Sequence, residues 1–138
     1  MECWELCAAL LERRFPGMRE RRARLQAAGA VLDRAFQLGG DARYCLDLAV
    51  RFSIIGTLAL SDEEIKLIDA EDPAAADAMR THTRLGARLL HKTFPDYPDA
   101  IEAVWYQYER FDGGGPFGLV GDEIPPIAQI NSLAHFLE

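Results

Sequence analysis

The sequence predicts an all-α protein, a bundle of about six to seven helices. Along most of its 138 residues, apolar side chains recur every three to four positions, which is the period of one helix face. No segment shows the strict alternation of apolar and polar residues that is typical of a strand. Glycine and proline gather between the periodic segments, where helices are expected to begin and end.

Two helices are predicted before residue 40, separated by Phe15-Pro16-Gly17. The apolar face of the first consists of Trp4, Cys7, Ala8 and Leu11. That of the second consists of Leu25, Ala28, Leu32, Ala35 and Phe36. Because glycine readily adopts the left-handed conformation that closes a helix, we expect Gly39 and Gly40 to end the second helix.

The segment from about residue 42 to 59 is apolar on almost every side. A helix of this kind is typically buried at the centre of a bundle. Ile54-Ile55 alone would also suit a buried strand, but the long flank without turn-forming residues favours a helix. We therefore expect one central helix over this segment.

The next two helices have clear start signals. Ser61 and Glu64 form a capping box, which predicts a short helix to about residue 70. Asp72-Pro73 then starts another helix, because proline suits the first helical turn. This second helix ends near residue 94, and its apolar stripe consists of Met79, His82, Leu85, Gly86, Leu89 and Leu90.

One further helix, a loop and a last helix complete the chain. Asp99 is expected to cap a helix whose inward residues are Ile101, Val104, Trp105 and Tyr108. Residues 111–126 are rich in glycine and proline, so they are predicted to form a loop. The last helix is expected to begin at about Pro126 and to run to the end of the sequence.

Composition excludes several classes of protein. The net charge of −7 disfavours a nucleic-acid-binding protein, which needs positive charge to contact phosphates. No apolar run is long enough to span a membrane, and the amino terminus lacks the features of a secretory signal. Three cysteines cannot all pair with one another, so free thiols and a cytoplasmic location are expected. We interpret Cys3 and Cys7, which share a helix face, as small buried residues rather than metal ligands.

The loop carries the most specific pattern in the chain. From residue 109 to 125 the sequence reads Glu-Arg-Phe-Asp-Gly-Gly-Gly-Pro-Phe-Gly-Leu-Val-Gly-Asp-Glu-Ile-Pro. This segment resembles the signature loop of HD-GYP domains, the helical phosphohydrolases that cleave the bacterial second messenger cyclic di-GMP. By this resemblance, the motif and interaction loop consists of Glu109, Arg110, Asp112, Gly113, Gly115, Pro116, Phe117, Gly118 and Leu119.

The resemblance extends upstream and covers about residues 8–136. The segment 79–87, in which His82 stands four residues before Gly86, looks like the family's helix with a metal-binding histidine. Ile55-Gly56 looks like part of the family's Asp-Ile-Gly-Lys segment. The fold implied by the resemblance is an HD-domain-like helical bundle.

Most of the metal ligands that the family uses are replaced in this chain. In HD-GYP domains, clustered His and Asp side chains hold two or three metal ions that generate a hydroxide nucleophile. By resemblance, the His-Asp pair falls at Ser53-Ile54, the double His falls at Gln107-Tyr108, and the first-helix His falls at Arg21. The family's Lys is Thr57, and the Tyr of its Gly-Tyr-Pro is missing. We therefore expect no catalytic residue and no bound metal.

Two histidines remain as candidate metal ligands. His82 keeps the identity that the family has there, and His135 falls where the family has an Asp in its last helix. His82 lies on an apolar helix face, where a hydrogen-bonded core histidine is the usual case. For His135 the partner ligands are missing, and helix ends usually expose their side chains. In a rearranged site built on these histidines, iron or manganese would be the metal.

The loop leaves several interpretations open. Glu109 and Arg110 either contact a nucleotide or lock the loop through an ion pair. Residues 113–115 either hold a phosphate through backbone N–H groups or form a tight surface turn. Phe117 is expected to be exposed and to anchor a partner protein. In the alternative arrangement, three apolar residues of the loop fold back onto the helices: Phe111, Leu119 and Ile124.

Taken together, these features predict one HD-GYP-like domain over residues 1–138, truncated at its carboxyl end, in a bacterial cytoplasm. The expected function is a non-catalytic signalling or regulatory one, as the output part of a two-component or cyclic di-GMP-related response regulator. The expected partners are a protein or an upstream receiver or sensor domain, with no nucleic acid and no membrane. Two alternatives stay open, namely a metal-dependent phosphodiesterase with a rearranged site and a domain that binds a cyclic dinucleotide without cleaving it.

Overall fold

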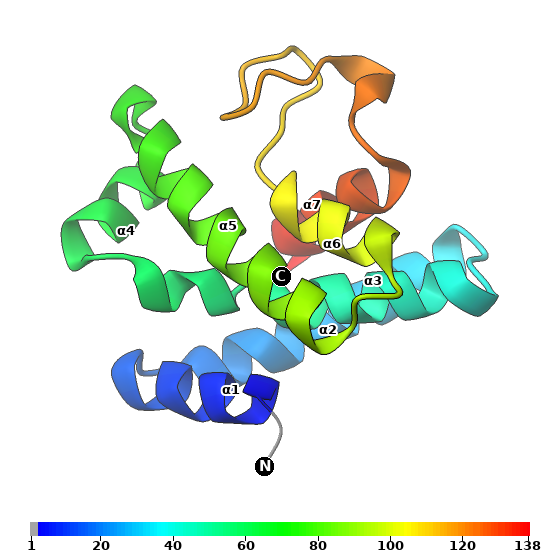
Figure 1. Cartoon of the computed structure of the whole chain (residues 1–138), viewed down its shortest axis with the longest axis horizontal. Coiled ribbons are helices and arrows are strands. Elements are labelled where there is room, and N and C mark those ends of the chain that lie inside the picture. The colour runs from blue at the N-terminus through cyan, green and yellow to red at the C-terminus, as the bar shows by residue number, and fades with distance from the viewer. Residues whose placement is uncertain (1–2) are drawn as a thin grey trace.

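Seven α-helices form the framework of residues 3–138, the part of the chain that this computed structural model describes (Figure 1). The helices are α1 (Cys3–Arg14), α2 (Met18–Ala35), α3 (Gly40–Phe52), α4 (Asp62–Asp69), α5 (Ala76–Thr93), α6 (Pro98–Trp105) and α7 (Pro126–Leu137). Three short 3-10 helices join them: η1 (Ile55–Ala59), η2 (Pro73–Ala75) and η3 (Gly121–Glu123). The described residues contain one isolated β-bridge, Asp112 with Val120, and no strand. The prediction of an all-α bundle is confirmed.

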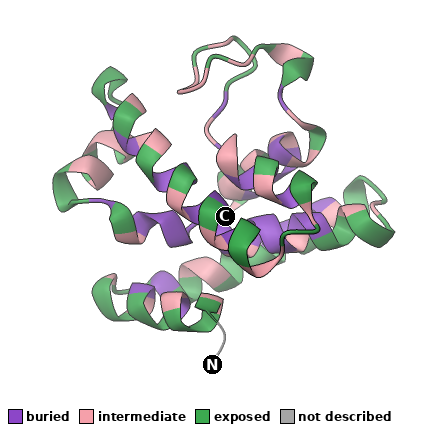
Figure 2. Cartoon of the chain, viewed as in Figure 1, coloured by how far each residue is buried: buried purple, intermediate pink, exposed green. Residues whose placement is uncertain are grey.

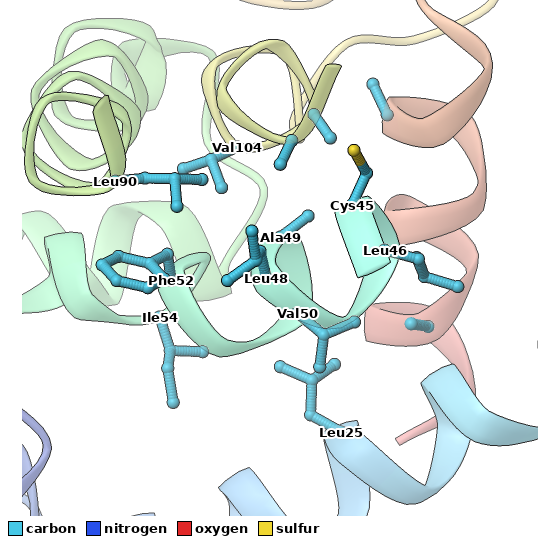
Figure 3. Packing of buried hydrophobic residues seen from close by; sticks show 14 of the residues in the cluster. Leu25, Cys45, Leu46, Leu48, Ala49, Val50, Phe52, Ile54, Leu90 and Val104 are labelled. Atoms are coloured by element: carbon cyan, nitrogen blue, oxygen red, sulfur yellow. The ribbon is translucent and has the colours of Figure 1, made fainter. Parts of the chain in front are cut away.

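The centre of the molecule is α3, which packs against α2, α5, α6 and α7. Buried residues are concentrated on this helix and on the sides of its neighbours that face it (Figure 2). Val50 points toward Leu25 of α2, and the side chains of Leu90 and Val104 lie on another side of α3 (Figure 3). The six buried residues of α3 are Cys45, Leu46, Leu48, Ala49, Val50 and Phe52. The expected central buried helix is therefore present.

The central helix is shorter than the sequence suggested. It ends at Phe52, and the chain turns at Ser53 and Ile54 before it enters η1. The change of direction keeps both Ile54 and Ile55 inside the protein, where they are 2% and 1% exposed. The prediction of a helix to residue 59 was wrong because an apolar run shows that a segment is buried, not that it is straight.

Close packing of α5 on this turn depends on two glycines. A Cβ atom at Gly56 would lie 1.8 Å from the carbonyl oxygen of His82, which is too close for any side chain. A Cβ atom at Gly86 would lie 3.0 Å from the carbonyl oxygen of Phe52. Both glycines thus allow the backbone of α5 to approach the turn closely, and His82 is carried toward Ser53.

Two predicted helix boundaries are corrected by the structure. Gly39 is extended, with φ −151°, and Gly40 begins α3 instead of ending α2. The left-handed residue that closes α2 is Gln37, with φ 53°, and Gly40 adopts the same φ at the start of α3. The N–H of Leu38 donates to the carbonyl of Asp33, and Leu38 packs on the core, so this apolar residue determines where the helix closes. Similarly, Asp99 lies within the first turn of α6 and is not its cap.

The other start signals are observed as predicted. The hydroxyl of Ser61 accepts from the N–H of Glu64 at 3.1 Å, and the Glu64 carboxylate accepts from the N–H of Ser61 at 3.0 Å. Asp72 accepts from the N–H of Ala74 at 2.8 Å and caps η2, which leads into α5.

The cysteines are placed differently from the expectation at one position. Cys3 is exposed, Cys7 is half-buried and Cys45 is buried, so the interpretation of Cys3 as a buried residue was wrong. Cys3 begins α1 on the side of the helix that faces solvent, whereas Ala8 and Leu11 face the core. Among the described residues, no helix has both the length and the apolar character needed to cross a membrane.

Candidate functional site

The residues at the family's ligand positions come together around one cavity of about 200 Å³, which we call the central pocket. Its lining consists of Arg21, Ile54, Thr57, Leu60, Ile65, Ile68, Asp69, His82, Gln107, Tyr108, His135 and Glu138. Five elements contribute to it: α2, the turn from α3 through η1, α4, α5 and α7, together with the segment that follows α6. Segments far apart in the sequence thus meet at this point.

Ser53 is the hub of the polar contacts beside the pocket. Its backbone carbonyl accepts from Nε2 of His82 at 2.7 Å and from Nε2 of Gln107 at 3.1 Å. Its hydroxyl donates to the carbonyl of Val50 at 3.0 Å. Because that proton is already used, the hydroxyl accepts from Nε2 of His135 at 2.8 Å. Ser53 therefore connects α3 with α5, α7 and the segment after α6.

Both ring nitrogens of His82 are engaged. Since a carbonyl can only accept, Nε2 carries the proton that is donated to Ser53, and this assigns Nδ1 as the unprotonated nitrogen. Nδ1 accepts from the hydroxyl of Tyr108 at 2.7 Å, and the two rings pack edge to face. The Tyr108 hydroxyl and the Ser53 carbonyl together fix the orientation of this imidazole and its Nε2-protonated tautomer.

Burial keeps the titratable groups of the cluster uncharged. It lowers the pKa of His82 to about 4, although the hydrogen bond to Ser53 opposes the shift. The pKa of His135 is lowered to about 3 by burial and by the positive charge of Arg21. Burial raises the pKa of Tyr108. At neutral pH the cluster is therefore an uncharged hydrogen-bonded network.

The donor groups around the pocket do not fit a transition-metal ion. A metal ligand needs a free lone pair, whereas the one lone pair of His82 accepts from Tyr108. Ile54, which is 2% exposed, has no donor atom. Within residues 3–138, no group of three or more His, Cys, Asp and Glu residues is arranged to hold a metal. We derive no chemical step through a metal at this site.

A salt bridge that was not predicted from the sequence lies at the edge of the pocket. Nε of Arg21 lies 3.0 and 3.2 Å from the two carboxylate oxygens of Glu138. The terminal NH2 group of Arg21 lies 3.0 Å from Oε1 of the same carboxylate. No local pattern could have predicted this pair, because its members are separated by 117 positions. His135, one turn earlier in α7, is half-buried by the same packing rather than exposed.

An ion pair and a buried carboxylate fix the glycine-rich loop. Arg110 forms an ion pair with Asp112 at 2.8 Å, whereas Glu109 contacts the loop through a hydrogen bond to its backbone. Glu109 is 8% exposed, and its Oε1 accepts from the N–H of Phe117 at 2.7 Å. A Cβ atom at Gly115 would lie 2.3 Å from Oε2 of Glu109, so glycine is required where this carboxylate passes.

The N–H groups of residues 113 and 114 are used within the loop. Gly113 donates to the carbonyl of Arg110 at 2.9 Å, and Gly114 donates to Asp112 at 2.8 Å. Gly113 has φ +83°, which favours glycine. The segment thus forms a tight turn stabilised by its own bonds. On the other side, Arg80 of α5 donates to the carbonyl of Pro116 at 2.7 Å and attaches the turn to the helices.

The aromatic residues of the loop have exchanged their expected positions. Phe117 is half-buried and packs against Trp105 and Tyr106, with ring centroids 6.1 and 5.6 Å away. Phe111 is 69% exposed. The expectation that Phe117 is the exposed residue was wrong, because the turn at residues 113–116 directs it back onto α6. Of the residues expected to fold back, Ile124 is buried, whereas Phe111 does not fold back.

The comparisons with known proteins give one match. A family model described as an HD domain matches residues 5–138, almost the whole chain. No curated protein and no solved structure gives a significant match.

Proposed function

Because the chain belongs to the HD domain family, whose members are generally metal-dependent phosphohydrolases, we propose that it is a non-catalytic, HD-GYP-like regulatory domain. In this proposal the helical scaffold of the family is kept and the metal centre is not. The single observation that carries it is the arrangement of His82. Its proton is donated to the Ser53 carbonyl and its lone pair accepts from Tyr108, so it has no lone pair free for a metal.

The signalling part of the proposal rests on the loop from residue 109 to 125. Its sequence resembles the HD-GYP signature, and its backbone is fixed by Glu109 and Arg80. We propose that the domain acts as the output part of a bacterial response regulator, and that it works by contact with a protein partner or with an upstream receiver or sensor domain. Phe111 and Val120, which are 69% and 52% exposed, are the apolar side chains that the loop offers for such a contact.

Metal content provides the first test. We expect the purified protein to hold well under one equivalent of iron, manganese or zinc, also after incubation with each metal and removal of the excess. Elemental analysis measures this directly. Two equivalents of metal that are lost in His82→Ala, but not in the control His91→Ala on the exposed side of α5, would overturn the proposal.

Hydrolysis provides the second test. Cyclic di-GMP and a chromogenic phosphodiester, each with added manganese, should be cleaved at the background rate, because the proposal leaves no metal-bound hydroxide. Tyr108 does donate to Nδ1 of His82, but burial raises the pKa of its hydroxyl and disfavours the deprotonated, nucleophilic form. Turnover above background that disappears in His82→Ala and persists in His91→Ala would show that the site is catalytic.

A further inference from the structure

We propose that the central pocket binds a small arylalkyl amine, an organic cation with one aromatic ring, rather than a phosphodiester. This inference rests on the proposed function, because a metal centre would fill the same space and reverse its charge. Three properties of the pocket carry it: its size and apolar wall, its charge, and the position of α4.

The size and the apolar wall fit one ring. The volume of about 200 Å³ is somewhat larger than the roughly 150 Å³ of an apolar cavity known to hold benzene. Ile54 and Leu60, which are 2% and 3% exposed, form the inner part of the apolar wall. Ile65 and Ile68 of α4 line the pocket from the outer side and are half-buried. Four branched aliphatic side chains thus surround a space that is too small for a dinucleotide.

The charge of the pocket disfavours an anion. The cation of the lining, Arg21, forms an ion pair with Glu138, so these two charges balance in number. The two histidines are neutral because burial lowers the pKa of each. Asp69 faces the pocket from the last turn of α4, and among the described residues it forms no ion pair. The lining therefore carries one unbalanced negative charge, which attracts an ammonium group and repels a phosphate.

The wall formed by α4 can move without disrupting the core. None of the residues of α4 is buried, although the helix carries three of the lining residues, Ile65, Ile68 and Asp69. Figure 1 shows α4 at the periphery of the molecule. A displacement of this helix would move only half-buried side chains of α4 and would open the pocket to its inner wall of Ile54 and Leu60. Asp69 would lie at the entrance, where it can pair with the ammonium group while the ring contacts the isoleucines.

Three probes that share one ring and differ in charge test the proposal. They are benzylamine (cation), benzyl alcohol (neutral) and phenyl phosphate (anion), and binding is measured by NMR titration of the full chain at neutral pH. We expect benzylamine to bind roughly two- to fivefold more tightly than benzyl alcohol, the range that one solvent-exposed charge pair supports. Phenyl phosphate is expected to bind most weakly.

Two variants locate the binding. Asp69→Asn should remove the preference for benzylamine over benzyl alcohol, whereas Glu63→Gln should leave it unchanged. Glu63 is the matched control, since it is an exposed acid of the same helix that does not line the pocket. Ile68→Trp should fill the pocket and abolish binding of every probe. Ile68 is only half-buried, so this variant is expected to fold, and its melting curve verifies that it does.

Four outcomes would overturn the inference: no binding of any probe at millimolar concentrations, tightest binding of phenyl phosphate, an unchanged preference in Asp69→Asn, or undiminished binding in folded Ile68→Trp. The proposed function fails on different evidence, namely bound metal or phosphodiester hydrolysis. A metal-free, inactive protein that binds none of the probes would contradict the arylalkyl-amine proposal alone.

Discussion

The central pocket and the glycine-rich loop differ in the residues that stand at the positions aligned with the HD-GYP motifs. In the loop, residues that match the HD-GYP signature fix the backbone: the Glu109 carboxylate accepts from the N–H of Phe117, and Gly115 leaves the space in which this carboxylate lies. Beside the pocket, the positions aligned with the metal ligands hold other residues, and hydrogen bonds centred on Ser53 connect the helices instead. The comparison shows that the loop positions hold a surface backbone in shape, whereas the pocket positions form a buried hydrogen-bonded network between helices.

The largest expected effect tests whether the pocket is an apolar core at its inner wall. Ile54→Asp should lower the free energy of unfolding by about 3–5 kcal/mol, because it places an unpaired carboxylate at a position that is 2% exposed. The control Ile54→Val removes one methylene and should cost only about 0.5–1.5 kcal/mol. Denaturant unfolding measures both. Similar losses in the two variants would show that the wall tolerates charge, and the contrast with the loop would disappear.

Acid should weaken the pocket cluster in a defined pH range. The pKa of His82 is about 4 in the folded protein and about 6.5 when unfolded, so between these values the unfolded chain binds more protons. The stabilisation is complete above pH 6.5 and is lost as the pH falls toward 4, by about 1.4 kcal/mol per pH unit for this histidine. Burial raises the pKa of Glu109 in the loop, so this carboxyl works in the opposite direction.

Unfolding measured across that pH range separates these contributions. Replacement of the exposed His91 by Gln should leave the slope unchanged, whereas His82→Gln should reduce it. A slope in His82→Gln equal to that of the wild type would mean that the fold does not hold His82 neutral.

Within the loop, the buried carboxylate should matter more than the exposed one. Glu109→Ala removes the acceptor of the Phe117 N–H and should lower stability by about 1.5–3 kcal/mol, as expected for a hydrogen bond to a charged group. Glu123→Ala is the control, since Glu123 accepts from the N–H of Val120 at the surface. Hydrogen exchange at the Phe117 amide should accelerate only in Glu109→Ala. Equal losses of stability in the two variants would contradict the role of Glu109 in holding the backbone of the loop.

The smallest expected effect concerns the exposed aromatic residue. Phe111→Ala should change stability by no more than about 0.5 kcal/mol, because the ring is 69% exposed. Phe117→Ala should cost at least about 1 kcal/mol, because this ring packs between Trp105 and Tyr106. Thermal melts compare the two variants. A larger loss of stability in Phe111→Ala than in Phe117→Ala would contradict the assignment of Phe111 as the exposed contact residue.

Local signals in the sequence predicted most of the fold. The capping box at Ser61, the helix start at Asp72 and the glycine loop each depend on residues only a few positions apart. The apolar environment of His82 followed from the periodicity of its helix. Such features are readable because their physical cause lies within one or two turns of chain.

The parts that could not be predicted depend on distant partners or on backbone atoms. The pairing of Arg21 with Glu138 joins α2 to the end of α7. The turn that directs Phe117 onto α6 depends on Glu109, eight positions away. The carbonyl of Ser53 has no sequence signature at all, because every residue type has one. Gln37 could not be identified as the left-handed residue either, because the packing of Leu38 on the core determines where α2 ends.

The main-chain bond between Ser53 and His82 does not depend on the side chain at position 53. Any amino acid there supplies the same carbonyl, so the Nε2–H of His82 keeps its acceptor and the ring keeps its tautomer. The lone pair of His82, in contrast, is occupied by a side chain, the hydroxyl of Tyr108. One nitrogen of His82 is therefore held independently of sequence, and the other depends on the residue at position 108.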